Sequence, residues 1–167
     1  GVLLYSGYQL YSIYSEYQKG RSEYKRTSEE VVTKKEEKKE EKPAEKPAPV
    51  ETAPIDVDFN KLLKKNSDVA GWIYCPDTVV NYPVMHGEDN ELYLHRTFGG
   101  NENAHGCIFA DTSCSVTKPS DNIILYGHHM KDGSMFAMLD QYKKESFWQE
   151  HPVICFDTLY RQGSYEV

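Results

Sequence analysis

The sequence has none of the short motifs that mark common metal and hydrolase sites. Its four cysteines form no C-x-x-C pair, which argues against a zinc ribbon or a thioredoxin-type redox site. No two of its six histidines have the four-residue spacing of H-E-x-x-H, and no G-x-S-x-G elbow is present. The histidines available to a metal site are His86, His95, His105, His128, His129 and His151. These patterns support neither zinc chemistry nor a serine triad.

Positive charge is scarce in the C-terminal two-thirds of the chain. Residues 55–167 carry nine Lys and Arg against sixteen Asp and Glu, whereas residues 1–54 carry ten of each sign. The net charge of −7 therefore comes from the second segment. Because nucleic-acid binding needs a basic surface that pairs with phosphates, we expect no nucleic-acid partner.

The chain also lacks a long apolar run. Its first five residues are apolar, but a bilayer-spanning helix takes about 20. Leu10, Ile13 and Tyr17 continue along one stripe at helical spacing. Tyrosines are frequent along this stretch, and such rings favour a membrane–water interface. Residues 1–26 are therefore expected to be the end of a membrane anchor or a juxtamembrane helix. The alternative is a helix that packs on the folded domain.

Residues 27–54 have almost no large apolar side chains. They alternate Lys-Lys and Glu-Glu pairs and then contain Pro43, Pro47, Pro49 and Pro54. The first part can form transient helix through i,i+4 Glu–Lys pairs, and the second is stiff and extended. Because such a composition cannot bury a core, we predict a spacer over 27–54 and a folded domain over 55–167.

Short apolar and β-branched runs separated by turn residues dominate the predicted domain. They predict strands at residues 71–74, 79–84, 106–110, 122–126, 152–156 and 160–167. Helical stretches are expected at residues 59–66, 88–98 and 134–148. Many short strands with few helices favour a mainly β, barrel-like fold. We expect this fold to be incomplete in the chain, with the last strand cut off in mid-course.

The cysteines carry little information about the compartment. Cys155 lies in the apolar run 153–156 and is predicted to be a small buried side chain. A disulfide between Cys107 and Cys114 is an alternative that an extracellular location would permit. The sequence pattern leaves that alternative open.

Two adjacent histidines follow an apolar strand and a glycine. The run 123–126 is followed by Gly127, His128 and His129. A strand exit is a place where a scaffold can present a general acid or base, and an unperturbed imidazole titrates near neutral pH. Adjacent side chains of a strand point to opposite faces, so the two histidines are expected to differ in their roles. A structural role for both is the alternative.

Six stretches of the chain, taken in order, resemble class B sortases. They are Gly71-Trp72-Ile73, Asn81-Tyr82-Pro83-Val84, Asp89-Asn90 with Tyr93-Leu94, Gly106 with Ile108-Phe109 and Asp111, Tyr126-Gly127-His128-His129, and Gly133 with Met135-Phe136. They cover roughly residues 57–167. The resemblance implies a β-barrel enzyme with short helices, in which a cysteine thiolate attacks a Thr carbonyl in a C-terminal sorting signal.

The resemblance also implies partners and a location. The acyl-enzyme would be resolved by an amine of a peptidoglycan precursor or a pilin. The protein would sit at the cell membrane through a single N-terminal anchor, with its catalytic domain outside the cell. No metal or other cofactor is implied.

Four positions match residues with roles in that family. His128 matches the catalytic histidine, which would handle protons at the thiol and at the leaving or attacking amine. Asn90, Leu94 and Tyr126 match positions that line the sorting-signal groove. The neighbouring His129 is given no catalytic role.

The chain departs from the family at the nucleophile. The family cysteine lies in a T-L-x-T-C strand with an arginine shortly after it, and neither motif occurs before Val167. Both are expected beyond that residue, so the chain alone is expected to be inactive. The alternatives are a non-catalytic surface module that binds peptide or cell wall and, with less support, a metal-dependent wall hydrolase that uses the histidines.

Overall fold

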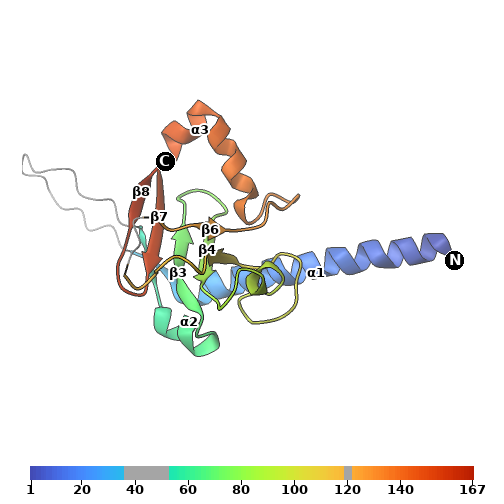
Figure 1. Ribbon diagram of the computed structural model, residues 1–167. Helices are drawn as coiled ribbons and strands as arrows, with labels where there is room; N and C mark the ends of the chain where they lie inside the picture. Colours follow the sequence, from blue (N-terminus) through green and yellow to red (C-terminus); the bar gives the residue numbers. More distant parts are fainter. Residues whose placement is uncertain (36–52, 119–121) are drawn as a thin grey trace, which may run out of the picture.

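A computed structural model describes residues 1–35, 53–118 and 122–167 of the chain (Figure 1). The α-helices are α1 (Val2–Val31), α2 (Phe59–Lys65) and α3 (Glu145–Glu150), and the 3-10 helices are η1 (Leu92–Leu94) and η2 (Phe136–Lys143). The strands are β1 (Val32–Lys34), β2 (Ile55–Val57), β3 (Val69–Tyr74), β4 (Asn81–Met85), β5 (Ile108–Ala110), β6 (Leu125–Tyr126), β7 (Val153–Thr158) and β8 (Ser164–Glu166). The mainly β fold with short helices that the sequence predicts is confirmed.

The main sheet has six strands in the order β6-β5-β4-β3-β7-β8. Neighbouring strands are antiparallel except for β4 and β5, which are parallel. The central strand β3 is buried along most of its length, because β4 and β7 flank it and side chains cover both of its faces. Gly71 lets β7 approach closely, since a Cβ there would lie 2.5 Å from the carbonyl oxygen of Asp157.

The core forms around the middle of this sheet. Trp72, Val84 and Ile108 are almost completely buried and come from three adjacent strands. The Trp72 indole N–H is satisfied by the side-chain oxygen of Asn81 at 2.7 Å. This hydrogen bond joins the side chains of β3 and β4 beside the buried core.

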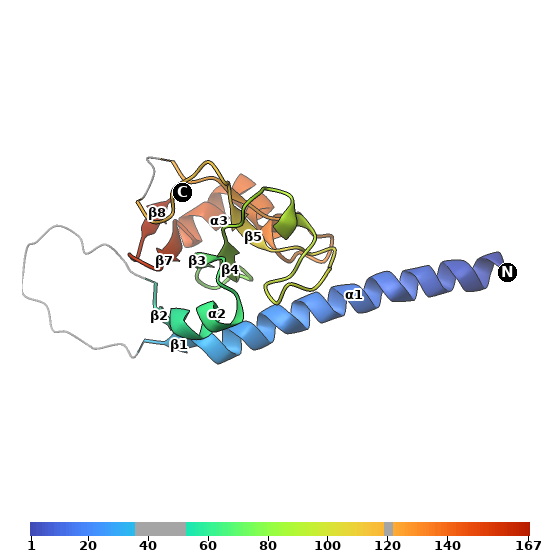
Figure 2. The same ribbon diagram turned by 60° about the horizontal axis from the view of Figure 1, so that its bottom comes forward.

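Helix α1 has two parts with different surroundings. Its C-terminal half lies along the domain and buries Tyr24, Thr27 and Val31, whereas its N-terminal half projects away from the sheet (Figures 1 and 2). In the projecting half, Leu3 is 89% exposed and Leu10 is 70% exposed. No helix within the described ranges combines the length and the apolar character that crossing a membrane requires.

Part of the segment that the sequence predicts as a spacer is regular structure. Residues 27–31 continue α1, and strand β1 pairs in antiparallel fashion with β2, with Val32 opposite Val57. The N–H of Lys35 also bonds to the carbonyl of Pro54 at 3.0 Å. The rest of the predicted spacer, residues 36–52, lies outside the described residues.

The predicted helix over residues 88–98 is wrong. Only the short η1 forms there. The Asp89 carboxylate accepts hydrogen bonds from the N–H groups of Glu91 and Leu92 at its start, and the carbonyls of Tyr93 and His95 then bond to N–H groups of residues 103–107 instead of continuing a helix. The helical stretch predicted at 134–148 is present but divided, with η2 and α3 meeting at Lys144.

Candidate functional site

His128 lies just after the edge strand β6, and one of its ring nitrogens is already engaged. Its Nε2 lies 2.7 Å from the backbone carbonyl oxygen of Leu94. A carbonyl can only accept, so Nε2 carries the proton of this bond. In the neutral ring Nδ1 is then the acceptor, and it makes no hydrogen bond within the described part of the chain. The ring is half-buried, which fixes it without hiding it from solvent.

His129 has different surroundings from its neighbour. Its Nε2 lies 2.6 Å from the carboxylate of Asp140, and its side chain is 64% exposed. Lys143 contacts the same carboxylate at 2.6 Å. His129 therefore belongs to an exposed cluster with Asp140 and Lys143, and His128 belongs to the surface formed by β6 and the η1 segment.

Asp111 joins two of the residues that match the sorting-signal groove. Its Oδ2 accepts a hydrogen bond from the side-chain N–H of Asn90 and another from the Tyr126 hydroxyl, each at 2.9 Å. Its Oδ1 accepts from the backbone N–H and the hydroxyl of Ser113 at 2.8 and 2.6 Å. Asn90 is fixed a second time, because its oxygen accepts from the N–H of Thr112 at 3.0 Å. The two side chains are thus held in place by one carboxylate.

These hydrogen bonds favour the ionised form of Asp111. The bonds from Ser113 and then from Tyr126 lower the pKa of the Asp111 carboxyl to about 2. The same contact raises the pKa of the Tyr126 hydroxyl, because ionising it would place two negative charges side by side. At neutral pH the cluster is therefore a carboxylate that accepts from a neutral phenol.

The four residues that the sequence singles out form two linked pairs. Asn90 and Tyr126 share Asp111, and Leu94 holds His128 through its backbone carbonyl. Strand β6 connects the pairs, since Tyr126 ends the strand and His128 follows two residues later. Sequence reasoning included Asp111 in the matched series without a role, because no local pattern shows that three other side chains bond to it.

The titration of Asp111 gives a first prediction. A carboxyl whose pKa is lowered by folding stabilises the folded state fully above its ordinary pKa of about 3.9, and this contribution is lost as the pH falls through the folded value. We expect the 13C signal of this carboxyl to titrate with a midpoint of about 2. Tyr126→Phe removes one donor and should raise the midpoint. An unchanged midpoint in that variant would show that the phenol does not stabilise the carboxylate.

The four cysteines of the chain are all buried, and none forms a disulfide. Cys107 contacts the Tyr24 hydroxyl at 3.2 Å, and burial raises the pKa of its thiol to about 12. Cys75 contacts Tyr142, and Cys114 contacts backbone groups near β6. The disulfide between Cys107 and Cys114 that the sequence left open is absent, and Cys155 is buried as predicted.

The described ranges contain no group of three or more His, Cys, Asp or Glu side chains arranged to hold a metal ion. The ring of His95 lies near that of His128, with a centroid distance of 6.5 Å and a tilt of 42°.

Comparison with known proteins places the chain among sortases. It is 40% identical over 109 residues to sortase B of Staphylococcus aureus and 37% identical over 101 residues to sortase B of Listeria monocytogenes. These matches cover 65% and 60% of the chain but only 44% and 41% of the relatives, so the chain spans less than half of their length. No family model matches.

Solved structures give the same result over more of the chain. The crystal structure of sortase B from B. anthracis in complex with AAEK1 superposes with a TM-score of 0.75 at 31% identity, covering 93% of this chain and 68% of that one. A substrate complex of S. aureus sortase B superposes with a TM-score of 0.64 at 39% identity, covering 65% and 50%. Both the sequence and the fold of the chain are thus similar to those of sortase B proteins. The chain belongs to the class B sortase family.

Proposed function

We propose that this chain carries the histidine part of a cysteine transpeptidase, with His128 as the proton-transfer group. The observation that carries the proposal is the geometry of that ring. Nε2 is held by the Leu94 carbonyl, so Nδ1 is the nitrogen left to exchange a proton with a substrate. The ring stands at a strand exit beside positions that match the family's peptide groove.

The proposed reaction has two steps that use this nitrogen. The step starts from a cysteine thiolate and the imidazolium form of His128, which carries a proton on each ring nitrogen. The thiolate attacks the Thr carbonyl carbon of a sorting signal, and the bond to the following residue breaks as the leaving amine takes the proton from Nδ1 of His128. The resulting thioester is attacked by an acceptor amine, which gives its proton back to His128 as the new amide forms. The thiolate is released in that step, and the proton that His128 gave to the leaving amine is replaced by the proton that the acceptor amine gives up.

None of the cysteines in this chain fits the role of the nucleophile. All four are buried: burial raises the pKa of the Cys107 thiol to about 12, Cys75 contacts the Tyr142 hydroxyl, and Cys114 contacts backbone groups. We propose that the nucleophile and its arginine are supplied by a further segment of the protein, so that both parts are needed for the reaction. Strand β6 is a suitable neighbour for such a segment, because it is an edge strand that pairs with β5 on one side.

The proposed substrate is the extended sorting-signal peptide of a surface protein. Tyr126 is 39% exposed and is fixed at its hydroxyl, so its ring can pack against a peptide without losing side-chain entropy. Asn90 is fixed by Asp111 and Thr112, and this orients its amide beside the groove. The acceptor in this proposal is an amine of a peptidoglycan precursor or of a pilin.

The projecting half of α1 supports a location at the cell membrane. Leu3, Leu4 and Leu10 are at least 70% exposed, and Tyr8 and Tyr11 are 67% and 69% exposed. Apolar and tyrosine side chains at these exposures suit the interfacial region of a bilayer. We propose that this half lies at the membrane as part of a single N-terminal anchor, with the sheet domain outside the cell.

The test of the function is to trap the acyl-enzyme. The natural protein at its full length is incubated with sorting-signal peptides and then with an amine acceptor, and the intact mass is followed. A mass increase equal to the peptide up to its Thr, lost on addition of the amine, is the expected result. Peptide that binds but is never cleaved would contradict the proposal and favour a non-catalytic binding module.

A further inference from the structure

Helix α1 holds one loop of the domain, residues 103–107, by direct hydrogen bonds. The backbone carbonyl of Glu16 accepts from the side-chain N–H of Asn103 at 2.9 Å. The Glu16 carboxylate accepts from the backbone N–H of Ala104 at 2.8 Å. Both bonds join residues more than 80 positions apart in the chain, so they fix where the helix lies on the domain.

The contact between helix and loop is closest one turn later. A Cβ on Gly20 would lie 3.2 Å from Nδ1 of His105, so a glycine permits this approach. The Tyr17 ring packs edge-on against the His105 ring, with centroids 4.7 Å apart. Further along, the Tyr24 hydroxyl donates to the carbonyl of Gly106. Three successive turns of α1 therefore hold the loop.

The same loop fixes the segment that anchors His128. Its first residue, Asn103, donates its backbone N–H to the carbonyl of His95 at 2.9 Å. Its last residue, Cys107, donates to the carbonyl of Tyr93 at 2.7 Å. The carbonyl between these two is the one that accepts from the His128 ring. The position of that acceptor thus depends on a loop that the helix holds.

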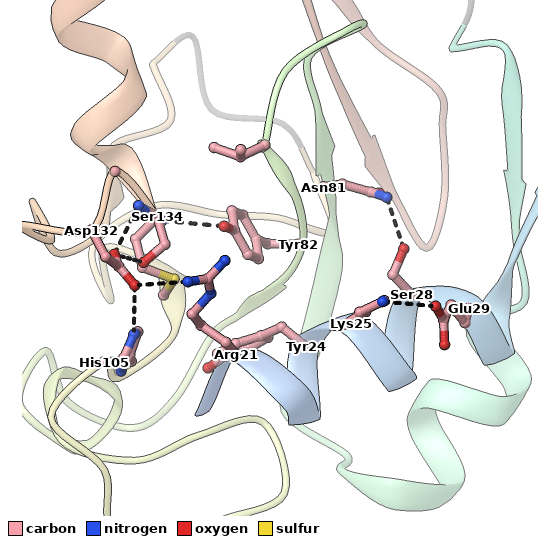
Figure 3. Close-up of a pocket in the computed structure, with 13 residues that line it drawn as sticks. Arg21, Tyr24, Lys25, Ser28, Glu29, Asn81, Tyr82, His105, Asp132 and Ser134 are labelled. Carbon is pink, nitrogen blue, oxygen red and sulfur yellow. Dashed lines mark hydrogen bonds and ion pairs between the residues drawn. The ribbon is translucent and has the colours of Figure 1, made fainter. Parts of the chain in front are cut away.

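A second contact joins α1 to the loop that follows His128. Arg21 approaches Oδ2 of Asp132 to 3.8 Å, and Nε2 of His105 approaches the same oxygen to 3.9 Å (Figure 3). The other oxygen of Asp132 accepts two hydrogen bonds from Ser134, which orient the carboxylate toward the helix. These groups line a cavity of about 330 Å³ between the helix and the domain.

His105 is a neutral group at this contact between α1 and the domain. Its Nδ1 faces the side-chain oxygen of Asn103 at 3.2 Å, and that oxygen is an acceptor because the amide nitrogen donates to Glu16. Nδ1 therefore carries the proton, and burial lowers the pKa of the ring. The attraction for the Asp132 carboxylate comes from Arg21, on the helix.

We propose that α1 positions the histidine of the site, with Gly20 and Tyr24 as the positioning residues. The helix holds the 103–107 loop, the loop holds the carbonyls on both sides of the His128 acceptor, and Arg21 holds the loop on the other side of His128. Loosening the contacts between α1 and the 103–107 loop therefore lets the Leu94 carbonyl move and weakens its bond to the His128 ring. An effect of α1 on catalysis rests on the proposed function, whereas the coupling between α1 and the His128–Leu94 hydrogen bond does not.

The experiment compares two matched pairs of variants in the natural protein at its full length. Gly20→Ala places a methyl group 2.9 Å from the side-chain oxygen of Asn103, whereas Gly7→Ala meets nothing within 4 Å on the same helix. Tyr24→Phe removes the bond to the loop, whereas Tyr14→Phe changes a ring that is 62% exposed. Long-range 15N–1H spectra of labelled histidines report the state of His128 Nε2, and far-UV circular dichroism reports the fold.

The Gly20→Ala and Tyr24→Phe variants are expected to move the His128 Nε2 resonance and to speed exchange of its proton by about tenfold or more. The two control variants should leave both unchanged. An unchanged Nε2 signal in folded Gly20→Ala and Tyr24→Phe proteins would overturn the proposal. Global unfolding of both would also overturn it, because the helix would then support the whole domain rather than the histidine. Since no step of the test needs turnover, its failure would leave the transpeptidase proposal standing.

Discussion

Replacing His128 by alanine is expected to lower sorting-peptide cleavage by about 10²–10⁴-fold in the full-length protein. The reason is chemical rather than structural. The variant removes the proton carrier for the leaving amine, and the only hydrogen bond it loses in the described residues is the one to the Leu94 carbonyl. Such a bond contributes about 1 kcal/mol to stability, so the thermal unfolding temperature should change little.

The control for this experiment is the adjacent histidine. His129→Ala removes a surface pair with Asp140, whose contribution is about 0–1 kcal/mol because the side chains are solvated. Cleavage by that variant should stay close to the unmodified rate. If His128→Ala kept activity within about tenfold of the unmodified protein, His128 would not be an essential proton-transfer group.

The strands could be predicted because their signal is local. The run over β3 contains the β-branched Val69 and Ile73 and the aromatic Trp72, and the structure buries it between two neighbouring strands. The helix predicted over 88–98 failed because its local signal competed with a distant partner. The carbonyls of Tyr93 and His95 bond to the 103–107 loop and so are not available to a helix.

The length of α1 was harder to predict from composition. Tyr17, Tyr24 and Val31 are seven residues apart and face the domain, but charged residues between them resemble a solvated spacer. A narrow buried stripe is enough because most of the stability of a helix in a protein comes from packing against its partner surface. The partner is the loop with His105, a buried histidine that no sequence pattern singles out.

The candidate site was predictable only where a side chain carries the role. His128, Asn90 and Tyr126 could be matched to family positions because their side-chain chemistry is visible in the sequence. Leu94 holds the histidine through its backbone carbonyl, a group that every residue has. Asp111 bonds to Asn90 and Tyr126, which are 21 and 15 residues away in the sequence, and the pairing of β5 with β6 brings Tyr126 near it.

Gly106→Ala is expected to have the largest effect on stability among the glycine variants of this region. Gly106 has a φ of +54°, which costs a residue with a side chain about 1–2 kcal/mol. A Cβ there would also lie 2.5 Å from the carbonyl oxygens of Tyr93 and Leu94. Because these are backbone atoms held by other bonds, relief requires a shift of the chain, which costs about 1–3 kcal/mol more. We expect a total loss of about 2–5 kcal/mol in the free energy of unfolding.

Gly100→Ala separates the two causes of this loss. Gly100 has a φ of +82°, and a methyl group there would meet nothing within 4 Å, so only the backbone cost of about 1–2 kcal/mol applies. Denaturant unfolding of both variants gives the difference, which measures the clash with the carbonyls. Equal losses would show that the loop relaxes freely. A larger loss for Gly106→Ala, with a displaced His128 resonance in the remaining folded protein, would show that one rigid contact maintains both the fold and the acceptor of the histidine.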